Sequence, residues 1–160
     1  MKGKEQTMGL DMWLYKRGHT VHDEMTGKTY VEDPEEIGYW RKFNALHAYI
    51  LELTNSPADT NCEPVDLSKS DVETILDTLN QVRSILEKGV KLEEDGDWYI
   101  FDENTSDAAA ELLPPRSGFF FGSTTIDAYY YDDVCDAISI FENALKLINE
   151  DEEIYYDCWW

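Results

Sequence analysis

Residues 112–133 are the stretch that most constrains this fold, because prolines, glycines and aromatic residues crowd into it. The proline pair that begins at Pro114 must end any preceding helix, since proline lacks an amide hydrogen and its ring clashes with the previous turn. Gly118 and Gly122 bracket three consecutive phenylalanines, and this short apolar run predicts a buried strand over 119–121. We therefore expect a turn, a strand and a helix in succession here.

The residues after this run predict a helix start. Ser123, Thr124 or Thr125 offers a hydroxyl that can cap the helix, and Asp127 falls in the first turn, where the helix dipole favours a carboxylate. One interpretation is an anion or nucleotide pocket, in which backbone amides and Arg116 face a phosphate. The segment lacks the lysine of a P-loop and the glycine spacing of a dinucleotide fingerprint. The other interpretation is a turn, a core strand and a capped helix without a ligand.

Hydrophobic periodicity predicts the remaining elements. Alternating apolar residues indicate a strand over 8–16, and shorter candidates for strands lie at 29–31 and 98–101. Apolar residues at three- and four-residue steps indicate helices over 37–54, 72–89, 105–113 and 127–149. Ser70 and Glu73 fit a capping box for the second of these helices.

The aromatic tail, residues 154–160, is expected to pack back as an edge strand; the alternative is an exposed contact patch. The order of the elements predicts the α+β class, with a small antiparallel or mixed sheet packed against three to four helices. The length of 160 residues suits one globular domain over 8–160, preceded by a flexible leader over 1–7.

Three cysteines, Cys62, Cys135 and Cys158, show no CxxC spacing, so the sequence supports neither a zinc ribbon nor a complete disulfide framework. No apolar stretch approaches the roughly 20 residues that span a bilayer, and the N-terminus has no apolar signal core. These features predict a protein of the reducing cytoplasm that does not bind a membrane.

The formal net charge of −21 is unevenly distributed. Residues 1–55 carry nine acids and seven bases, whereas residues 56–160 carry 25 acids and six bases. A field of this sign repels nucleic acid and anionic membranes, and it attracts a basic protein surface. The alternative explanation is solubility alone.

Two acidic clusters stand out within the second part of the chain. One comprises Glu93, Glu94, Asp95 and Asp97, and the other comprises Asp132, Asp133 and Asp136 on a predicted helix. Such carboxylates can imitate the charges of a nucleic-acid backbone and occupy the basic groove of a nucleic-acid-handling enzyme. They can also be an ordinary solvated surface.

Candidate ligand-binding residues gather in a second, basic segment. Asn44 and His47 are three positions apart on a predicted helix, so the amide could orient the imidazole for proton transfer while Arg41 or Lys42 holds an anion. With Arg116, Ser123 and Thr124 these residues would form a basic pocket in an acidic protein. Alternatively, His47 is a core residue in an apolar stripe. No catalytic triad can be singled out, and we predict no cofactor or metal ion.

Three segments, GLDMWLYKR at 9–17, YWRK at 39–42 and SGFFFGST at 117–124, resemble an uncharacterised group of small phage and prophage proteins. The resemblance carries no activity for any residue. It implies an accessory protein made inside a bacterial host cell during infection or lysogeny.

Together these observations favour a non-enzymatic phage accessory protein that inhibits a host nucleic-acid-directed defence system, of the anti-CRISPR or anti-restriction type, through an acidic surface. The alternative is a nucleotide- or phosphate-binding protein, either a hydrolase or a sponge for signalling nucleotides. A third possibility is a phage component that oligomerises through the aromatic tail.

Overall fold

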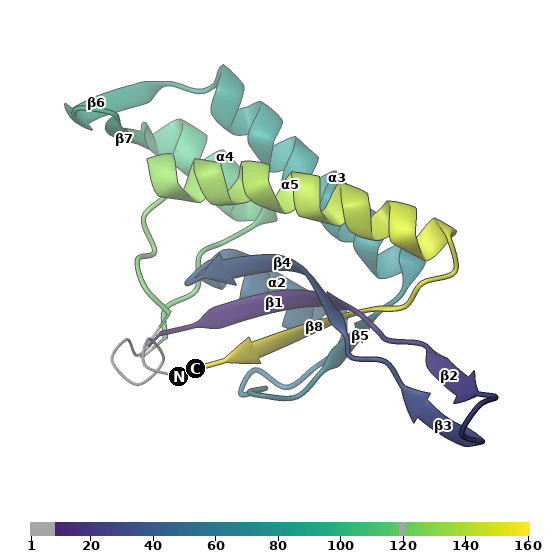
Figure 1. The fold of residues 1–160 in the computed structure, drawn as a ribbon. Helices are drawn as coiled ribbons and strands as arrows, with labels where there is room; N and C mark the ends of the chain where they lie inside the picture. Colours follow the sequence, from purple (N-terminus) through teal and green to yellow (C-terminus); the bar gives the residue numbers. More distant parts are fainter. Residues whose placement is uncertain (1–8, 119–120) are drawn as a thin grey trace.

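In the computed structural model, which describes residues 9–118 and 121–160, a four-stranded antiparallel sheet lies against a layer of helices (Figure 1). The strand order is β4 (Glu35–Arg41), β1 (Asp11–Lys16), β8 (Ile154–Trp159) and β5 (Val65–Leu67). The described residues form four helices: α2 (Asn44–Leu53), α3 (Lys69–Lys88), α4 (Glu103–Leu112) and α5 (Ala128–Asn149). The predicted α+β class is confirmed.

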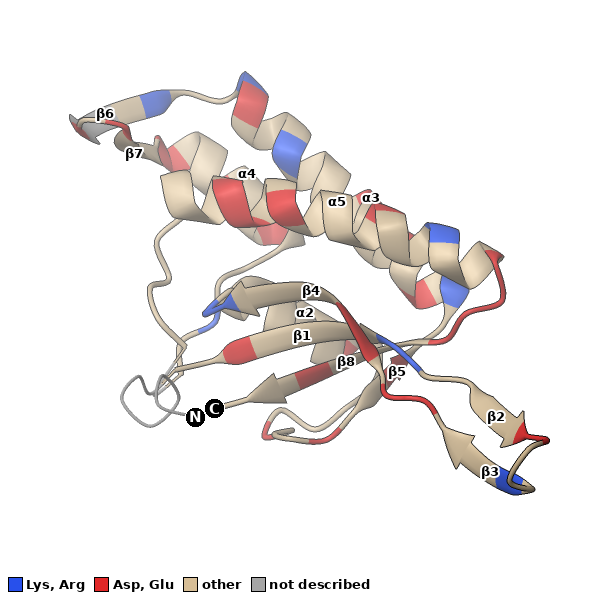
Figure 2. Ribbon diagram, in the orientation of Figure 1, with Lys and Arg blue, Asp and Glu red and all other residues tan. Residues whose placement is uncertain are grey.

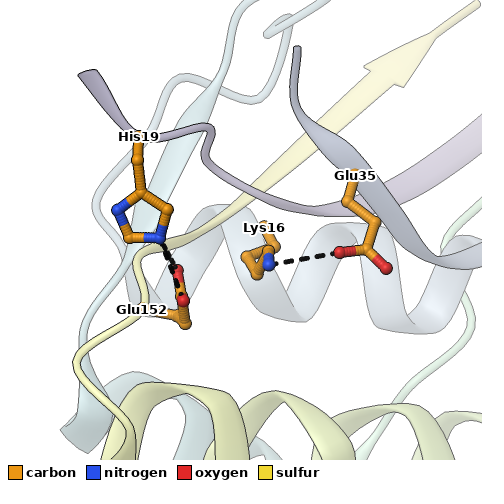
Figure 3. A network of polar contacts seen from close by, with 4 residues as sticks. All are labelled: Lys16, His19, Glu35 and Glu152. Carbon is orange, nitrogen blue, oxygen red and sulfur yellow. Dashed lines mark hydrogen bonds and ion pairs between the residues drawn. The ribbon is translucent and has the colours of Figure 1, made fainter. Parts of the chain in front are cut away.

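Two hairpins extend from this body. They are β2 (Thr20–Asp23) with β3 (Lys28–Val31), and β6 (Lys91–Asp95) with β7 (Trp98–Phe101). Figure 3 shows the root of the first hairpin, where Lys16 and Glu35 form an ion pair of 3.2 Å. Beside it, His19 Nε2 lies 3.0 Å from Glu152 Oε1, which connects the hairpin to the turn before β8.

The core forms where alternate residues of the sheet meet the helices. Met12 and Leu14 of β1 are fully buried. In the register of the sheet, Met12 lies opposite Trp40, and Leu14 lies opposite Tyr156. The Trp40 ring stacks on Phe141 of α5 with centroids 5.9 Å apart. The alternation that predicted β1 therefore also selects the face that the helices cover.

The prediction of a helix over 37–54 is wrong in its first part. Residues Glu35–Arg41 form β4, and the helix α2 begins only at Asn44. Trp40 and Phe43 lie three residues apart, which mimics a helical stripe, but pairing with β1 holds the chain before Arg41 extended. Long-range strand pairing thus overrode the local pattern.

The aromatic tail packs back as predicted, but β8 is an inner strand rather than an edge strand. It pairs with β1 on one side and with β5 on the other. Tyr156 and Cys158 are consequently buried, whereas the sequence offered no sign of a strand at 65–67 to cover the second side. The tail is part of the core and not a free contact patch.

Helix caps also differ from the prediction. The capping box of α3 uses Ser68 and Asp71 instead of Ser70 and Glu73. Asp127, rather than a hydroxyl of residues 123–125, is the N-cap of α5. The expected helices over 105–113 and 127–149 are confirmed within a residue or two as α4 and α5.

Residues 119 and 120 of the strand expected over 119–121 lie outside the described residues. The leader expected over 1–7 lies outside them as well. Phe121 is buried but lies in a bend and not in a strand. None of the helices in the described part of the chain is long and apolar enough to cross a membrane.

Candidate functional site

Asn44, the first residue of α2, anchors the loop that leads to α5. Its side chain is 3% exposed, and its Nδ2 donates hydrogen bonds to the carbonyls of Phe121 at 3.0 Å and Ser123 at 2.8 Å. Its Oδ1 accepts a hydrogen bond of 2.8 Å from the backbone N–H of Arg116. The amide therefore holds both ends of the 116–123 loop, and its hydrogen-bonding groups are used in the fold.

A cavity of about 320 Å³ lies between the start of α2 and the start of α5; we call it the α2–α5 pocket. Of the seven predicted ligand-binding residues, four line it: Arg41, Lys42, Asn44 and Ser123. It is also lined by carboxylates that the ligand prediction did not include, those of Asp127, Asp132 and Asp133. The pocket thus has both basic and acidic lining.

The two basic residues of the pocket are held differently. Arg41 Nη1 donates to Oδ1 of the buried Asp11 at 2.8 Å, and the Tyr39 hydroxyl donates to the same oxygen at 2.5 Å. Lys42 adopts a left-handed backbone with φ of 60°. No hydrogen bond or ion pair joins its ammonium to the residues that the structure describes, and the residue is exposed. Lys42 therefore adds an exposed positive charge to the lining of the pocket.

The acidic lining comes from the N-terminal part of α5. Asp127 Oδ1 accepts a hydrogen bond of 3.1 Å from the backbone N–H of Tyr130, which caps the helix. Asp133 lies half-buried six residues further along the helix. Burial raises the pKa of Asp133 to about 7, with smaller contributions from the negative charges of Asp136, Asp132 and Asp127. Asp133 therefore favours a proton or a cation beside it.

His47 and Arg116 line a separate, smaller cavity of about 80 Å³. His47 Nδ1 shares a hydrogen bond of 2.7 Å with the Tyr156 hydroxyl, and the edge of the imidazole meets Phe121. Burial, aided by the charge of Arg116, lowers the pKa of His47 to about 4. His47 is thus neutral at pH 7, and Arg116 itself pairs with Glu52.

The structure does not bring the seven predicted residues into one basic pocket. Four line the α2–α5 pocket, His47 and Arg116 line the smaller cavity, and Thr124 lines neither. The ligand prediction did not include Asp127, although the sequence placed it in the first turn of a helix, and it did not include Asp11. Asp11 meets Tyr39 and Arg41 only through the pairing of β1 with β4, which no local sequence signal shows.

Figure 2 shows red segments at the β6–β7 hairpin, on α4 and near the start of α5, with blue segments on β6 and at the end of α3 beside them. Nζ of Lys91 in β6 lies 5.9 Å from the centroid of the Tyr131 ring in α5. A backbone bridge between Ile100 and Asp127 joins β7 to the start of α5. The Tyr131 hydroxyl donates to Glu87 Oε2 at 2.6 Å and ties α5 to the end of α3. We define the acidic end as the carboxylates of Glu87, Asp95, Asp97, Glu103, Asp132, Asp133 and Asp136. Glu93 and Glu94 belong to the backbone of β6, but their side chains lie outside the description.

In the described part of the chain, no cluster of three or more His, Cys, Asp or Glu side chains is arranged to hold a metal ion. No protein-family model, no curated protein and no solved structure matches the chain.

Proposed function

We propose that the protein is a non-enzymatic binding protein whose acidic end engages a basic surface of a partner. The observation that carries this proposal is that the β6–β7 hairpin and the start of α5, which carry two acidic clusters some 35 positions apart in the chain, lie at the same end of the fold. Residues 127–136 hold four carboxylates and no lysine or arginine. The raised pKa of Asp133 supports the proposal, because a cation from a partner would relieve the repulsion among these groups.

The partner class that fits best is a nucleic-acid-handling enzyme. Carboxylates at positions 132 and 136 are one helical turn apart and are fixed by the helix, so they present a preset row of negative charges. Such a row competes with phosphates for a basic groove, and its complementary field also accelerates association. The resemblance to phage and prophage proteins makes a host defence enzyme of the CRISPR or restriction type, in the bacterial cytoplasm, the proposed target.

The test is protection of incoming DNA in cells that carry defined restriction or CRISPR systems. The wild-type chain is expected to raise transformation or plaque numbers against at least one system. The triple variant Asp132→Asn, Asp133→Asn, Asp136→Asn should lose this protection, because it removes three carboxylates from the acidic end, of which Asp133 is about half protonated near pH 7.

A matched variant removes three charges elsewhere: Glu24→Gln, Glu32→Gln, Asp33→Asn at the exposed β2–β3 hairpin. It should retain protection if position rather than total charge matters. Protection that survives in the α5 triple variant, or a wild-type chain that protects against no system, would overturn the proposal.

A second candidate function is binding of a phosphate or nucleotide in the α2–α5 pocket. It is favoured by Lys42 and by the N-terminus of α2, where the N-cap residue Phe43 provides no side-chain hydrogen bond to the helix amides. Helix N-termini with free amides attract anions. The carboxylates of Asp132 and Asp133 in the same lining oppose a ligand of high negative charge.

Thermal-shift measurements with inorganic phosphate, ATP and cyclic nucleotides test this second candidate. A ligand at 100 times its dissociation constant adds about 2.7 kcal/mol of stability. Lys42→Ala should abolish the shift, whereas Arg116→Ala should keep it, since Arg116 lies in the other cavity. The absence of any shift, or a shift that persists in Lys42→Ala, rejects this function.

A further inference from the structure

The loop before β5 runs along the end of β8 and brings two cysteines together. The backbone N–H of Cys62 donates to the carbonyl of Cys158 at 2.8 Å. The neighbouring Asn61 side chain bonds the backbone of Trp160 twice, donating to its carbonyl at 2.6 Å and accepting from its N–H at 2.9 Å. This double contact fixes the two segments side by side.

The two cysteines are direct neighbours across the two segments. A single backbone hydrogen bond, from the N–H of Cys62 to the carbonyl of Cys158, joins them. Disulfides span Cα separations of roughly 4.4–6.8 Å, which residues in such contact can meet. Cys158 Sγ points toward the loop, since it donates to the carbonyl of Thr60 at 3.4 Å. Cys62 adopts a left-handed backbone with φ of 59°, a conformation that a non-glycine residue holds only under constraint from its surroundings.

The two thiols differ in access to solvent. Cys62 is exposed, whereas Cys158 is 1% exposed in the core. Burial is the main cause that raises the pKa of Cys158 to about 12, so its thiol is a poor first target for an oxidant. An oxidant in solution therefore meets Cys62 first, with Cys158 in position to resolve the product.

We propose that Cys62 and Cys158 form an intramolecular disulfide when the protein is exposed to a hydroperoxide. In the first step the Cys62 thiol takes up one oxygen atom from hydrogen peroxide, giving a sulfenic acid and one water. In the second step the Cys158 sulfur attacks the Cys62 sulfur, and the hydroxyl of the sulfenic acid leaves with the Cys158 proton as a second water. Two thiols are oxidised and one peroxide is reduced to two waters.

The disulfide would restrain residues that lie next to the smaller cavity. Trp160 Nε1 donates to the carbonyl of Thr60 at 3.0 Å, and the Trp160 ring packs edge-on against Phe121 at 5.4 Å. Phe121 in turn belongs to the loop that Asn44 holds. A covalent bond at Cys62 thus fastens the C-terminal strand to a loop that supports the smaller cavity.

The test uses the full chain, reduced and then treated with hydrogen peroxide, followed by alkylation of the remaining thiols. Wild type should lose two of its three alkylatable thiols and 2 Da of mass before alkylation. Trypsin should release peptides 43–69 and 147–160 linked to each other. The treated protein should also melt several degrees higher than the reduced protein, because the bond closes a long loop of the unfolded chain.

Two variants make the test specific. Cys135→Ser, which removes the third thiol, should form the same linked peptides as wild type. Cys62→Ser changes an exposed residue. After peroxide treatment this variant should form no linked peptides, and its melting temperature should not rise. The proposal is overturned if treated wild type carries sulfinic acid at Cys62 with Cys158 still alkylatable, if the link joins two chains, or if it involves Cys135.

Discussion

The Asn44 region and the acidic end are both rich in polar residues. The polar groups around Asn44 are hydrogen-bonded to one another, whereas the carboxylates of the acidic end lie beside groups of the same charge. Around Asn44 the polar atoms bond one another: one buried amide serves three backbone groups. At the acidic end the carboxylates stand beside other carboxylates, and Asp133 has a raised pKa as a result of burial and of these neighbours. Polar groups that satisfy each other stabilise a fold, whereas charges that repel each other are available to a partner.

This comparison predicts that substitutions in the first region destabilise the protein and that substitutions in the second stabilise it while impairing binding. Such a trade between stability and function is common at binding sites.

Asn44→Ala should lower the free energy of unfolding by about 3 kcal/mol, because the carbonyls of Phe121 and Ser123 and the N–H of Arg116 lose their hydrogen-bond partner, and the Phe121 bond is buried. Urea unfolding monitored by tryptophan fluorescence measures the change. Asn143→Ala, at an exposed position of α5, is the control and should change stability by less than about 0.5 kcal/mol. Equal effects of the two substitutions would show that the three hydrogen bonds of Asn44 do not stabilise the fold.

Gly122→Ala should destabilise by about 1–2 kcal/mol. Gly122 has a φ of 85°, and an added Cβ would lie 3.1 Å from Cβ of Lys42. Gly27→Ala separates these two causes, because Gly27 has a φ of 72° with no atom within 4 Å of an added Cβ. The same unfolding assay should show a larger loss for Gly122; a smaller loss there would mean that the loop moves away from Lys42 without cost.

Asp133→Asn should stabilise the protein by about 1 kcal/mol at pH 8. This is less than the free energy that corresponds to the full pKa shift, because Asp133 is partly exposed and solvent screens its charge. The pKa of Asp133 in the folded state lies above its unfolded value of 3.8. Its proton is therefore held more tightly in the folded state, and the wild type loses stability as the pH rises from about 4 through 7.

The gain from Asp133→Asn should accordingly disappear below pH 4, which unfolding curves across the pH range can follow. Asp136→Asn, an exposed position on the same helix, should give a smaller gain. A gain for Asp133→Asn that does not depend on pH would argue against charge repulsion as its cause.

Arg116→Ala should change stability by less than about 0.5 kcal/mol, since the ion pair of Arg116 with Glu52 is exposed on both sides. Thermal melts in low and high salt measure this small effect. A loss above 1 kcal/mol would place the guanidinium, and not only the backbone N–H of Arg116, among the groups that hold the loop.

Parts of this protein could be predicted from local sequence because their signals are local. The helix α5 repeats apolar residues along one face, and β1 alternates apolar with polar residues. The acidic character of the second part of the chain also follows from counting residues. These patterns depend on neighbours within a few positions, so no knowledge of the fold is needed to find them.

Other features arise from contacts between residues far apart in the chain. Pairing with β1 makes Glu35–Arg41 a strand, and pairing with β5 makes the C-terminal strand an inner one. The amide of Asn44 finds its partners more than 70 positions away, and Cys62 meets Cys158 only because a loop follows the end of β8. Composition and periodicity do not predict these long-range contacts, because the register of a sheet is set by the packing of the whole core. The local sequence was enough for α4, α5 and the charge of this protein, because these signals are local. The tertiary structure decided where α2 begins, which strands pair, and which polar groups bond one another, because these depend on contacts between distant residues.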